Sequence, residues 1–372
     1  MPYYPHQTLI LGMATILRER RLPPGAIGEV RVSIGAEIEP NTEVLRGAIP
    51  GEFILLDALK PLGLKSADAI TEDMLRVQPG EVVDPQTPIL TAGKGRGARS
   101  VFSPVPAIFS WLDGSRVILQ ADPVAVSVLA LTPGRVTSVR GDQAVVIETT
   151  GALIQGAWGN GRSAFATLSM EPEGGIESLQ GEVMLLDQAR TAVVMRGPIR
   201  EPGVFAIAQQ QSISALIAPS MSTSLREIAL RQTIPVILTE GFGDMQMSEI
   251  VYNLLRGNVG RTAAVDAIEP SRWSEERPEI VIPIGASGSR PPVPVKDQPL
   301  GEGALVRVTR APYAGAVGRV RRIVEGPRPV ENGLRLNGAD VQIGDGKDAK
   351  TVFVPLANLV LLGRPMDAPG RA

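Results

Sequence analysis

The chain has 372 residues, enough for roughly two to four domains with their own cores, and its 40 glycines and 32 prolines favour a turn-rich, mostly β protein over a helical bundle. Its net charge of -2 argues against a protein that coats nucleic acid along its whole length. Cysteine is absent and histidine occurs once, at His6, which excludes disulfides, thiolate nucleophiles and Cys/His metal sites. We assign no catalytic residue, no metal site and no cofactor, and chemistry by Lys, Asp, Glu, Ser or Tyr side chains stays open.

The N-terminal residues carry no sign of a membrane segment. The apolar run at residues 8–17 is far shorter than the about 20 residues of a spanning helix. Arg18, Arg20 and Arg21 follow it, which is the reverse of the charge order in a signal peptide. We expect a cytoplasmic protein without a membrane partner. The periodicity of residues 7–21 fits a strand or a short helix.

Residues 1–130 form the first predicted unit, and an internal repeat organises it. VRVSIGAEIEPNTEVL at 30–45 returns as LRVQPGEVVDPQTPIL at 75–90, with Arg, Val, Gly, Pro, Thr and Leu in the same six places. Each copy predicts strand, Gly turn, strand, Pro turn, strand.

The second copy and the SPV strand that follows it resemble the barrel-sandwich hybrid of biotinyl and lipoyl carrier domains. That resemblance implies a flattened β-sandwich built from two similar halves. It does not extend to the modified lysine, because Lys94 lies in a Gly-rich loop without the expected hairpin pattern. We therefore expect the fold and not the covalent group.

The middle of the chain predicts two units. Residues 131–180 read as a small β segment or barrel, with short strands broken by Gly and Asp. In residues 181–286, short apolar strands alternate with helical stretches at 203–211, 222–232 and 247–256. This alternation predicts a parallel α/β module.

The turn TEGFGDMQMS at 239–248 is the candidate ligand site of this module. It follows a predicted strand and opens a helix, the place where α/β folds bind anions. Gly241 and Gly243 permit a close backbone approach, whereas Glu240 and Asp244 would repel a phosphate unless a cation intervened. The alternative is a tight turn with an Asp cap.

Residues 287–299 are Pro-rich and predict a linker that separates the module from a last unit at 300–364; residues 365–372 are a tail. In the last unit, GALVRVTRAPYAGAVGRVRRI at 303–323 resembles the KOW motif of NusG-type transcription elongation factors and of a large-subunit ribosomal protein. The resemblance implies an SH3-like barrel. Ala311 stands where the motif usually has a glycine.

The last unit is also the basic part of the chain. Residues 301–364 contain ten Lys/Arg and six Asp/Glu, a net charge of +4. Strand alternation predicts Arg307, Arg319 and Arg321 on one solvent face, with Tyr313 in the motif's turn. The expected partner is RNA, a ribonucleoprotein or a protein, and the sequence does not separate these.

The predicted fold is thus multidomain and mainly β, with a hybrid-like N-terminal domain, a parallel α/β middle and an SH3-like C-terminal barrel. The predicted function is a non-catalytic adaptor or scaffold that docks through the barrel. Two alternatives stay open: a phosphate-ligand sensor or enzyme centred on the turn at 240–244, and an assembly or docking subunit of a larger enzyme. The oligomeric state is not readable from the sequence.

Overall fold

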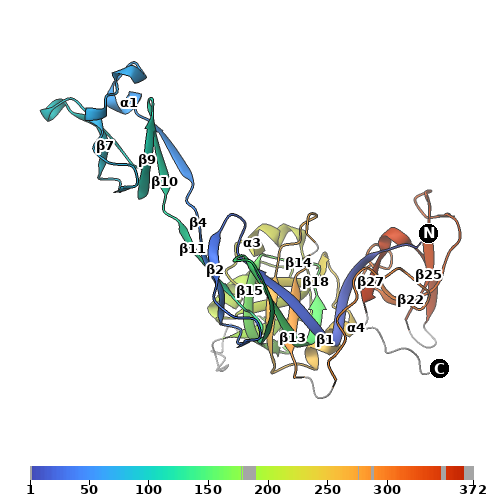
Figure 1. The fold of residues 1–372 in the computed structure, drawn as a ribbon. Coiled ribbons are helices and arrows are strands. Elements are labelled where there is room, and N and C mark those ends of the chain that lie inside the picture. Colours follow the sequence, from blue (N-terminus) through green and yellow to red (C-terminus); the bar gives the residue numbers. More distant parts are fainter. Residues whose placement is uncertain are drawn as a thin grey trace.

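A computed structural model describes residues 2–176, 178, 190–274, 276–285, 289–344 and 349–363. The protein is mainly β, with 46% strand and 12% helix, and combines a large mixed sheet with several small sheets. The large sheet crosses the body of the molecule, and a lobe projects at one end. At the other end the large sheet continues into the strands between residues 305 and 363, which we call the C-terminal sheet (Figure 1).

The largest sheet has 16 strands among the described residues. Its path is β14 (Trp158–Gly159), β18 (Val236–Phe242), β17 (Ala215–Met221), β16 (Thr191–Val194), β15 (Arg162–Met170), β19 (Thr262–Ala267), β20 (Glu279–Pro283), β13 (Ala144–Gln155), β1 (His6–Arg21), β27 (Leu359–Gly363), β21 (Leu305–Val308), β22 (Val317–Ile323), β25 (Gly338–Ile343) and β26 (Lys350–Pro355). β12 (Gly134–Arg140) pairs with β13 and with β3 (Glu37–Ile38). A short two-stranded sheet joins β23 (Arg328–Pro329) and β24 (Arg335–Leu336), and a 3₁₀ turn, η7 (Leu356–Asn358), precedes β27.

The parallel part of this sheet is short. The neighbouring pairs among β15, β16, β17 and β18 run parallel, as does the short pairing of β1 with β27, and β19 and β20 return antiparallel. The helical elements here are α2 (Gly203–Gln210), η5 (Thr223–Leu225), α3 (Arg226–Leu230) and α4 (Glu249–Arg256). The expected helix over 222–232 is therefore shorter than predicted, and Ser222 makes no side-chain cap.

Helices cover both faces of the parallel strands. On β17, Leu216 and Ala218 pack in one core with α2 and α3, while Ala215 and Ile217 pack in another with α4. Because successive strand residues point to opposite faces, α4 lies on the side opposite α2 and α3. The N-terminus of α4 borders the site described below.

The repeat predicted from the sequence forms two equivalent turns. Gly35 and Gly80 both have φ near +90°, a conformation that glycine adopts without strain. The amide of Arg31 donates to the carbonyl of Val44, and the amide of Arg76 donates to the carbonyl of Ile89, both at 2.9 Å. The two copies thus share their hydrogen bonds as well as their residues.

The two copies lie in separate cores. The first belongs to the body, where β2 (Ile27–Val30), β4 (Glu43–Ile49) and β11 (Val124–Leu129) form a three-stranded sheet. The second belongs to the lobe, residues 50–122, which has its own apolar cluster. The lobe contains β5 (Phe53–Asp57), α1 (Leu59–Leu62), η1 (Ala67–Ala69), η2 (Glu72–Met74), β6 (Val82–Val83), β7 (Pro88–Ala92), η3 (Gly95–Gly97), β8 (Arg99–Phe102), β9 (Ala107–Asp113) and β10 (Arg116–Ala121). The antiparallel strands β4 and β11 carry it away from the body (Figure 1).

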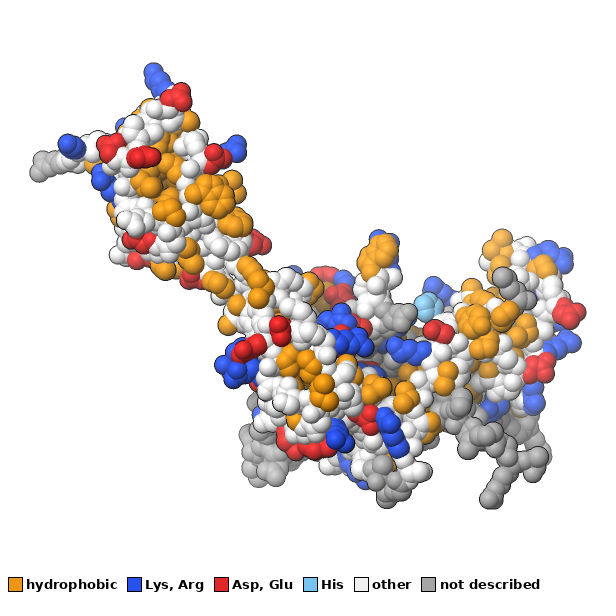
Figure 2. All heavy atoms as spheres, viewed as in Figure 1, with side chains coloured by type: hydrophobic (Ala, Val, Ile, Leu, Met, Phe, Trp, Pro, Cys, Tyr) orange, Lys and Arg blue, Asp and Glu red, His pale blue; other side chains and the backbone are white. Residues whose placement is uncertain are grey.

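One sheet face of the lobe is apolar and exposed. Leu55 pairs with Ile118, which pairs with Trp111, so all three lie on one face, and the ring of Phe53 contacts Trp111 edge-on at 6.1 Å. Phe53, Leu55 and Trp111 are at least half exposed. Apolar side chains are accordingly visible at the surface of the lobe in Figure 2. An exposed apolar patch of this kind is typical of an interaction site.

The C-terminal sheet is tied to the body by β1. Residues 6–9 of β1 pair in parallel with β27, and the rest of β1 pairs with β13. The Pro-rich segment, expected as a free spacer, is held along β1: the Thr15 amide donates to the Pro292 carbonyl at 3.1 Å, and Gln7 Nε2 donates to the Val295 carbonyl at 2.9 Å. A segment without periodicity can therefore still be fixed, because its carbonyls accept hydrogen bonds that local patterns do not reveal.

Candidate binding cleft between the C-terminal sheet and the α4 turn

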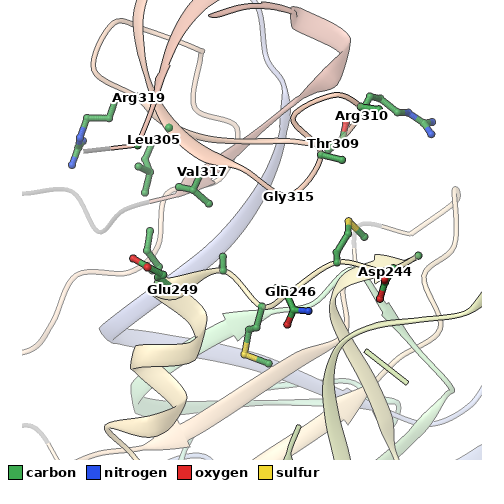
Figure 3. A pocket seen from close by; sticks show the side chains of 18 of the residues that line it. Asp244, Gln246, Glu249, Leu305, Thr309, Arg310, Gly315, Val317 and Arg319 are labelled. Carbon is green, nitrogen blue, oxygen red and sulfur yellow. The ribbon is translucent and has the colours of Figure 1, made fainter. Parts of the chain in front are cut away.

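The two site regions predicted from distant parts of the sequence meet in space. They form the two walls of a cleft of about 1480 Å³. One wall is the C-terminal sheet, and the other is the turn from β18 into α4 (Figure 3). The described lining residues are Phe242, Gly243, Asp244, Met245, Gln246, Met247, Ser248, Glu249, Ile250, Leu305, Thr309, Arg310, Ala311, Ala314, Gly315, Val317, Gly318, Arg319, Arg321, Gln342 and Gly344.

A buried ion pair joins the walls. Nη1 of Arg307, on β21, donates to Oε2 of Glu240, at the end of β18, and to the Thr239 carbonyl at 3.2 Å. Oε1 of Glu240 accepts from the amide of Ser248 at 3.1 Å, so the same carboxylate also satisfies the start of α4. The side chains of Arg307 and Glu240 are 9% and 1% exposed. Both are therefore structural groups, and neither is open to a ligand.

The expectation that Arg307 faces solvent is wrong, because another element covers the outer face of its strand. Alternation correctly points Arg307 away from the core of the C-terminal sheet, since Val306 and Val308 belong to that core. The outer face at this point is covered by the α4 turn, so an outward side chain becomes an interface side chain. Strand periodicity shows which side chains point away from a given core. It does not show whether another element covers the outer face of the strand.

The α4 turn is internally braced. Gly241 and Gly243 have φ of +111° and +129°, which other residues rarely adopt. Ser220 Oγ donates to the Met245 carbonyl at 2.8 Å and accepts from the Met245 amide at 2.9 Å. Asp244 forms an exposed ion pair with Arg200 at 2.7 Å. The turn thus uses several of its donors within the protein, as a tight turn does. The Asp cap expected in that alternative is not formed, because the N-cap of α4 is Ser248 and Asp244 pairs with Arg200.

The opposite wall presents unpaired arginines. Arg319 pairs across β22 and β25 with Gln342, and Arg319 and Arg321 are exposed beside the cleft. Arg310, at the other end, is also exposed (Figure 3). Within the described parts of the chain none of these three has an ion-pair partner. Their charge is therefore available to a ligand.

Tyr313 lies apart from the arginines with which the sequence grouped it. It packs partly buried against the core of the C-terminal sheet, and the Lys350 ammonium lies 5.4 Å from its ring centroid. It lines a different hollow, beside Pro312 and Phe353. The structure thus brings Arg319, Arg321 and the 240–244 turn together and leaves Tyr313 outside.

The cleft has mixed charge. Arginines occupy one wall, and the carboxylates of Asp244 and Glu249 lie on the other (Figure 3). Apolar surface from Leu305, Val317 and Ile250 lies between them. Sequence reasoning missed Glu249, although its place directly after the predicted turn, at the start of an amphipathic helix, would have marked it as a wall residue.

The Lys94 loop differs from the sequence expectation. Lys94 is exposed in the connection between the antiparallel strands β7 and β8, which pair up to Ala92 and Arg99. The lysine therefore does lie on a hairpin, with a loop of residues 93–98. The loop contains the 3₁₀ turn η3 and is longer than the two-residue turn of a tight hairpin.

Among the described residues, no three His, Cys, Asp or Glu side chains gather as metal ligands. No helix within the same residues has the length and apolar character needed to cross a membrane.

The chain matches no model of a known protein family, and no curated protein matches it.

Proposed function

We propose that this protein is a non-catalytic adaptor that grips a polar segment of a partner protein in the cleft between the C-terminal sheet and the α4 turn. The observation that carries the proposal is the buried Arg307–Glu240 pair. It joins the two walls of an open, mixed-charge cleft. Beside it, Arg310, Arg319 and Arg321 have no ion-pair partner among the described residues, and Arg319 donates only to the Gly303 carbonyl, at 3.4 Å. A rigid, preformed groove lowers the entropic cost of holding an extended segment.

The proposal includes a fold for the C-terminal unit and an origin for the repeat. We infer that residues 300–363 form an SH3-like barrel of the KOW type, a module used for docking, and that the repeat copies derive from a hybrid-like β unit. The alternating core of Val306, Val308 and Val320 supports the first inference. The matched turns at Gly35 and Gly80 support the second.

A protein segment fits the cleft better than RNA does. A phosphate chain lying against Arg319 and Arg321 would also face Glu249, which has no ion-pair partner among the described residues, and like charges across a binding groove cost affinity. A peptide can present acidic side chains to the arginines and basic or amide groups to the carboxylates. Phe242 is the single aromatic residue among the described lining residues, and it offers little stacking surface for bases.

The alternative of a phosphate-ligand sensor centred on the turn at 240–244 has less support. Both oxygens of Glu240 are engaged, and the Gly243 amide donates to the Met221 carbonyl at 2.9 Å. The docking-subunit alternative is compatible with the adaptor, because the exposed apolar face of the lobe offers a second contact surface.

The test uses the full chain and two labelled probes: a short peptide that alternates Glu and Lys with small residues, and a short oligouridylate. We expect the peptide to bind in fluorescence anisotropy at low salt. Replacing both Arg319 and Arg321 by Glu should weaken it roughly tenfold, since two partly exposed charge contacts are worth about 1–2 kcal/mol. The matched control is Arg335→Glu, an exposed arginine of the same unit outside the cleft.

Two outcomes would contradict the proposal. Binding of the oligouridylate with a steep salt dependence, and no binding of the peptide, would assign the arginines to nucleic acid. Equal losses in the double variant and the Arg335→Glu control would show that general charge and not the cleft holds the peptide.

A further inference from the structure

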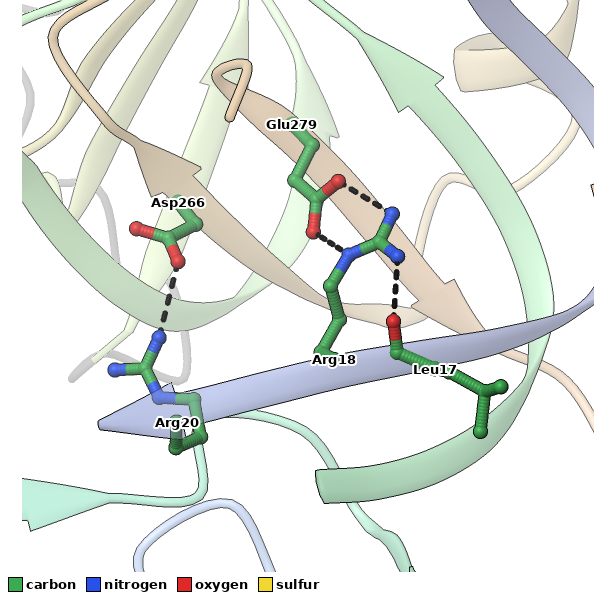
Figure 4. A network of polar contacts seen from close by, with 5 residues as sticks. All are labelled: Leu17, Arg18, Arg20, Asp266 and Glu279. Atoms are coloured by element: carbon green, nitrogen blue, oxygen red, sulfur yellow. Dashed lines mark hydrogen bonds and ion pairs between the residues drawn. The ribbon is translucent and has the colours of Figure 1, made fainter. Parts of the chain in front are cut away.

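The charged side chains between β1, β19 and β20 are satisfied within the chain. Arg18 binds both carboxylate oxygens of Glu279 (Figure 4). Beside this pair, Arg20 Nη1 donates to Asp266 Oδ2 at 3.1 Å. The lobe differs, because the outer edge of β5 presents main-chain donors and acceptors that no described residue uses.

The hydrogen bonds between β5 and β10 show which main-chain groups of β5 are unused. β5 pairs with β10 alone. At the two ends of this pairing, the Ala58 amide donates to the Ser115 carbonyl at 2.8 Å, and the Ala121 amide donates to the Glu52 carbonyl at 3.0 Å. Because hydrogen-bonded positions alternate along an antiparallel pair, the even-numbered residues of β5 bond to β10 and the odd-numbered residues face away. The groups that face away are the amides and carbonyls of Phe53, Leu55 and Asp57.

β5 lacks the features that usually protect the edge of a sheet. Proteins keep edge strands short, place Lys or Pro on them, or distort them with bulges, because an open edge attracts another strand. The opposite edge of the lobe sheet, β6, is two residues long, and β26 at one edge of the large sheet begins with Lys350 and ends with Pro355. β5 is five residues long, contains neither Lys nor Pro, and keeps an unbroken register with β10.

The side chains of this edge are apolar and exposed. Phe53 is 55% exposed and Leu55 is 60% exposed. Leu55 also begins an apolar row that runs across the sheet through Ile118 to Trp111. Unused main-chain groups match an extended strand, and apolar side chains at alternate positions match apolar side chains on that strand. β5 itself has both features.

We propose that β5 pairs antiparallel with β5 of a second copy of this chain, about a two-fold axis at Leu55. The unused groups are spaced evenly on either side of Leu55. This register therefore places Leu55 opposite Leu55 of the second copy and Phe53 opposite its Asp57, and every unused amide meets an unused carbonyl. The apolar row of Leu55, Ile118 and Trp111 continues into the same row of the second copy.

The surroundings of β5 allow this contact and limit its strength. β4 and β11 carry the lobe away from the body, so the edge is open to a second lobe (Figure 1). Asp57 keeps Arg116, its cross-strand neighbour on β10, beside it in the pair. A five-residue strand is about 17 Å long, so the contact covers less than the roughly 1,200 Å² of a standard interface. We therefore expect a reversible dimer.

Cysteine cross-linking tests the register, because the chain has no cysteine of its own. Directly opposite Cα atoms at hydrogen-bonded positions lie about 5.5 Å apart, which a disulfide can span. Under mild oxidation, full-length Leu55→Cys should become a covalent dimer. Phe53→Cys alone should not, because its two copies lie about 14 Å apart in this register. A mixture of Phe53→Cys and Asp57→Cys should cross-link.

Sedimentation equilibrium of the full chain tests the contact without a cross-link, and we expect a monomer–dimer equilibrium. Leu55→Pro removes an amide that the single chain leaves unused, and proline is tolerated at such edge positions. It should weaken dimerisation at least about tenfold, because each pair loses two hydrogen bonds. The control is Trp111→Gln, which changes the apolar face and leaves the edge of β5 intact, and it should change dimerisation little. Circular dichroism checks that both variants stay folded.

Three outcomes would overturn the proposal. The first is a chain that stays monomeric at every concentration, which would leave the edge to a different protein. The second is Leu55→Cys that cross-links no more than Phe53→Cys. The third is a dimer that Trp111→Gln weakens and Leu55→Pro does not, which would assign the contact to the apolar faces of the two lobes.

Discussion

Arg307 and Glu240 illustrate how a single pair of residues can decide the arrangement of two units. Each is charged, each is nearly inaccessible to water, and they come from elements far apart in the sequence. Removing one partner leaves the other charge buried without compensation, which costs far more than the pair contributes when intact.

We predict that Arg307→Met lowers the free energy of unfolding by about 3–5 kcal/mol. The double change Arg307→Met with Glu240→Gln should cost less than Arg307→Met alone, because no uncompensated charge remains. Urea unfolding of the full chain measures both. As a control, Arg322→Met breaks an exposed pair with Asp340 and should cost less than about 1 kcal/mol. A double variant with a lower free energy of unfolding than Arg307→Met would show that the two residues act through other contacts.

Asp266 should make stability depend on pH in an unusual direction. Burial raises the pKa of Asp266, the Arg20 guanidinium lowers it, and the neighbouring Glu279 raises it, with a net upward shift. Between the ordinary value of about 3.9 and the raised value, the folded state holds a proton that the unfolded chain has lost. The free energy of unfolding therefore falls as pH rises through this window.

Asp266→Asn removes this dependence. Relative to the unaltered protein, we expect the variant to gain stability as pH is raised from about 4, measured by urea midpoints over a pH series. Asp84→Asn is the opposite control. The Gln86 amide and the Thr87 hydroxyl lower the pKa of Asp84, so its contribution is present above the ordinary value and is lost as pH falls through the lowered one. Parallel pH profiles for the two variants would contradict the assignment.

At the scale of elements, the repeat separates local from global structure. Both copies fold alike because turn, alternation and proline are local signals, yet they enter different cores. Substitutions at equivalent positions of the two copies should therefore lower the free energy of unfolding by similar amounts. They should perturb different parts of the molecule.

We predict that Gly35→Ala and Gly80→Ala each destabilise by about 1–2 kcal/mol, since alanine is strained at these φ angles. Hydrogen exchange should show the Gly80 change only in residues 50–122 and the Gly35 change in the body. Gly97→Ala, which has an ordinary φ and open space, should change little. Faster hydrogen exchange in both the lobe and the body in either variant would show that the lobe does not unfold independently of the body.

The sequence predicts individual helices and strands better than it predicts which elements lie next to one another. The strands around Val193, Ile217 and Ile237 and the helices at 203–210 and 249–256 follow from apolar periodicity and Gly turns. The antiparallel return of β19 and β20 does not, because strand direction depends on a partner that local pattern does not specify. For the same reason Glu240 could be selected as a site residue while its partner Arg307 was assigned to solvent.

For the whole molecule, β1 determines how far the parts can separate. It pairs with β13 in the body and with β27 in the C-terminal sheet, and it holds residues 289–299 along its side. We predict that proteases cut slowly near Lys296 and release no stable C-terminal fragment. Gel analysis over a digestion time course checks this. An early, stable fragment that begins near Lys296 would contradict it.

The same strand has a consequence for biosynthesis. The hydroxyl of Tyr3 donates to the carbonyl of Leu356 across 353 positions of sequence, directly before the strand that completes β1. At about 5–20 residues per second, a ribosome needs roughly 20–70 s to supply that partner after β1 has emerged. During this interval the first residues of β1 present an unpaired strand edge, which can recruit other nascent chains. Translation speed, and chaperones that shield such an edge, should therefore govern the yield of correctly assembled protein more than its final stability does.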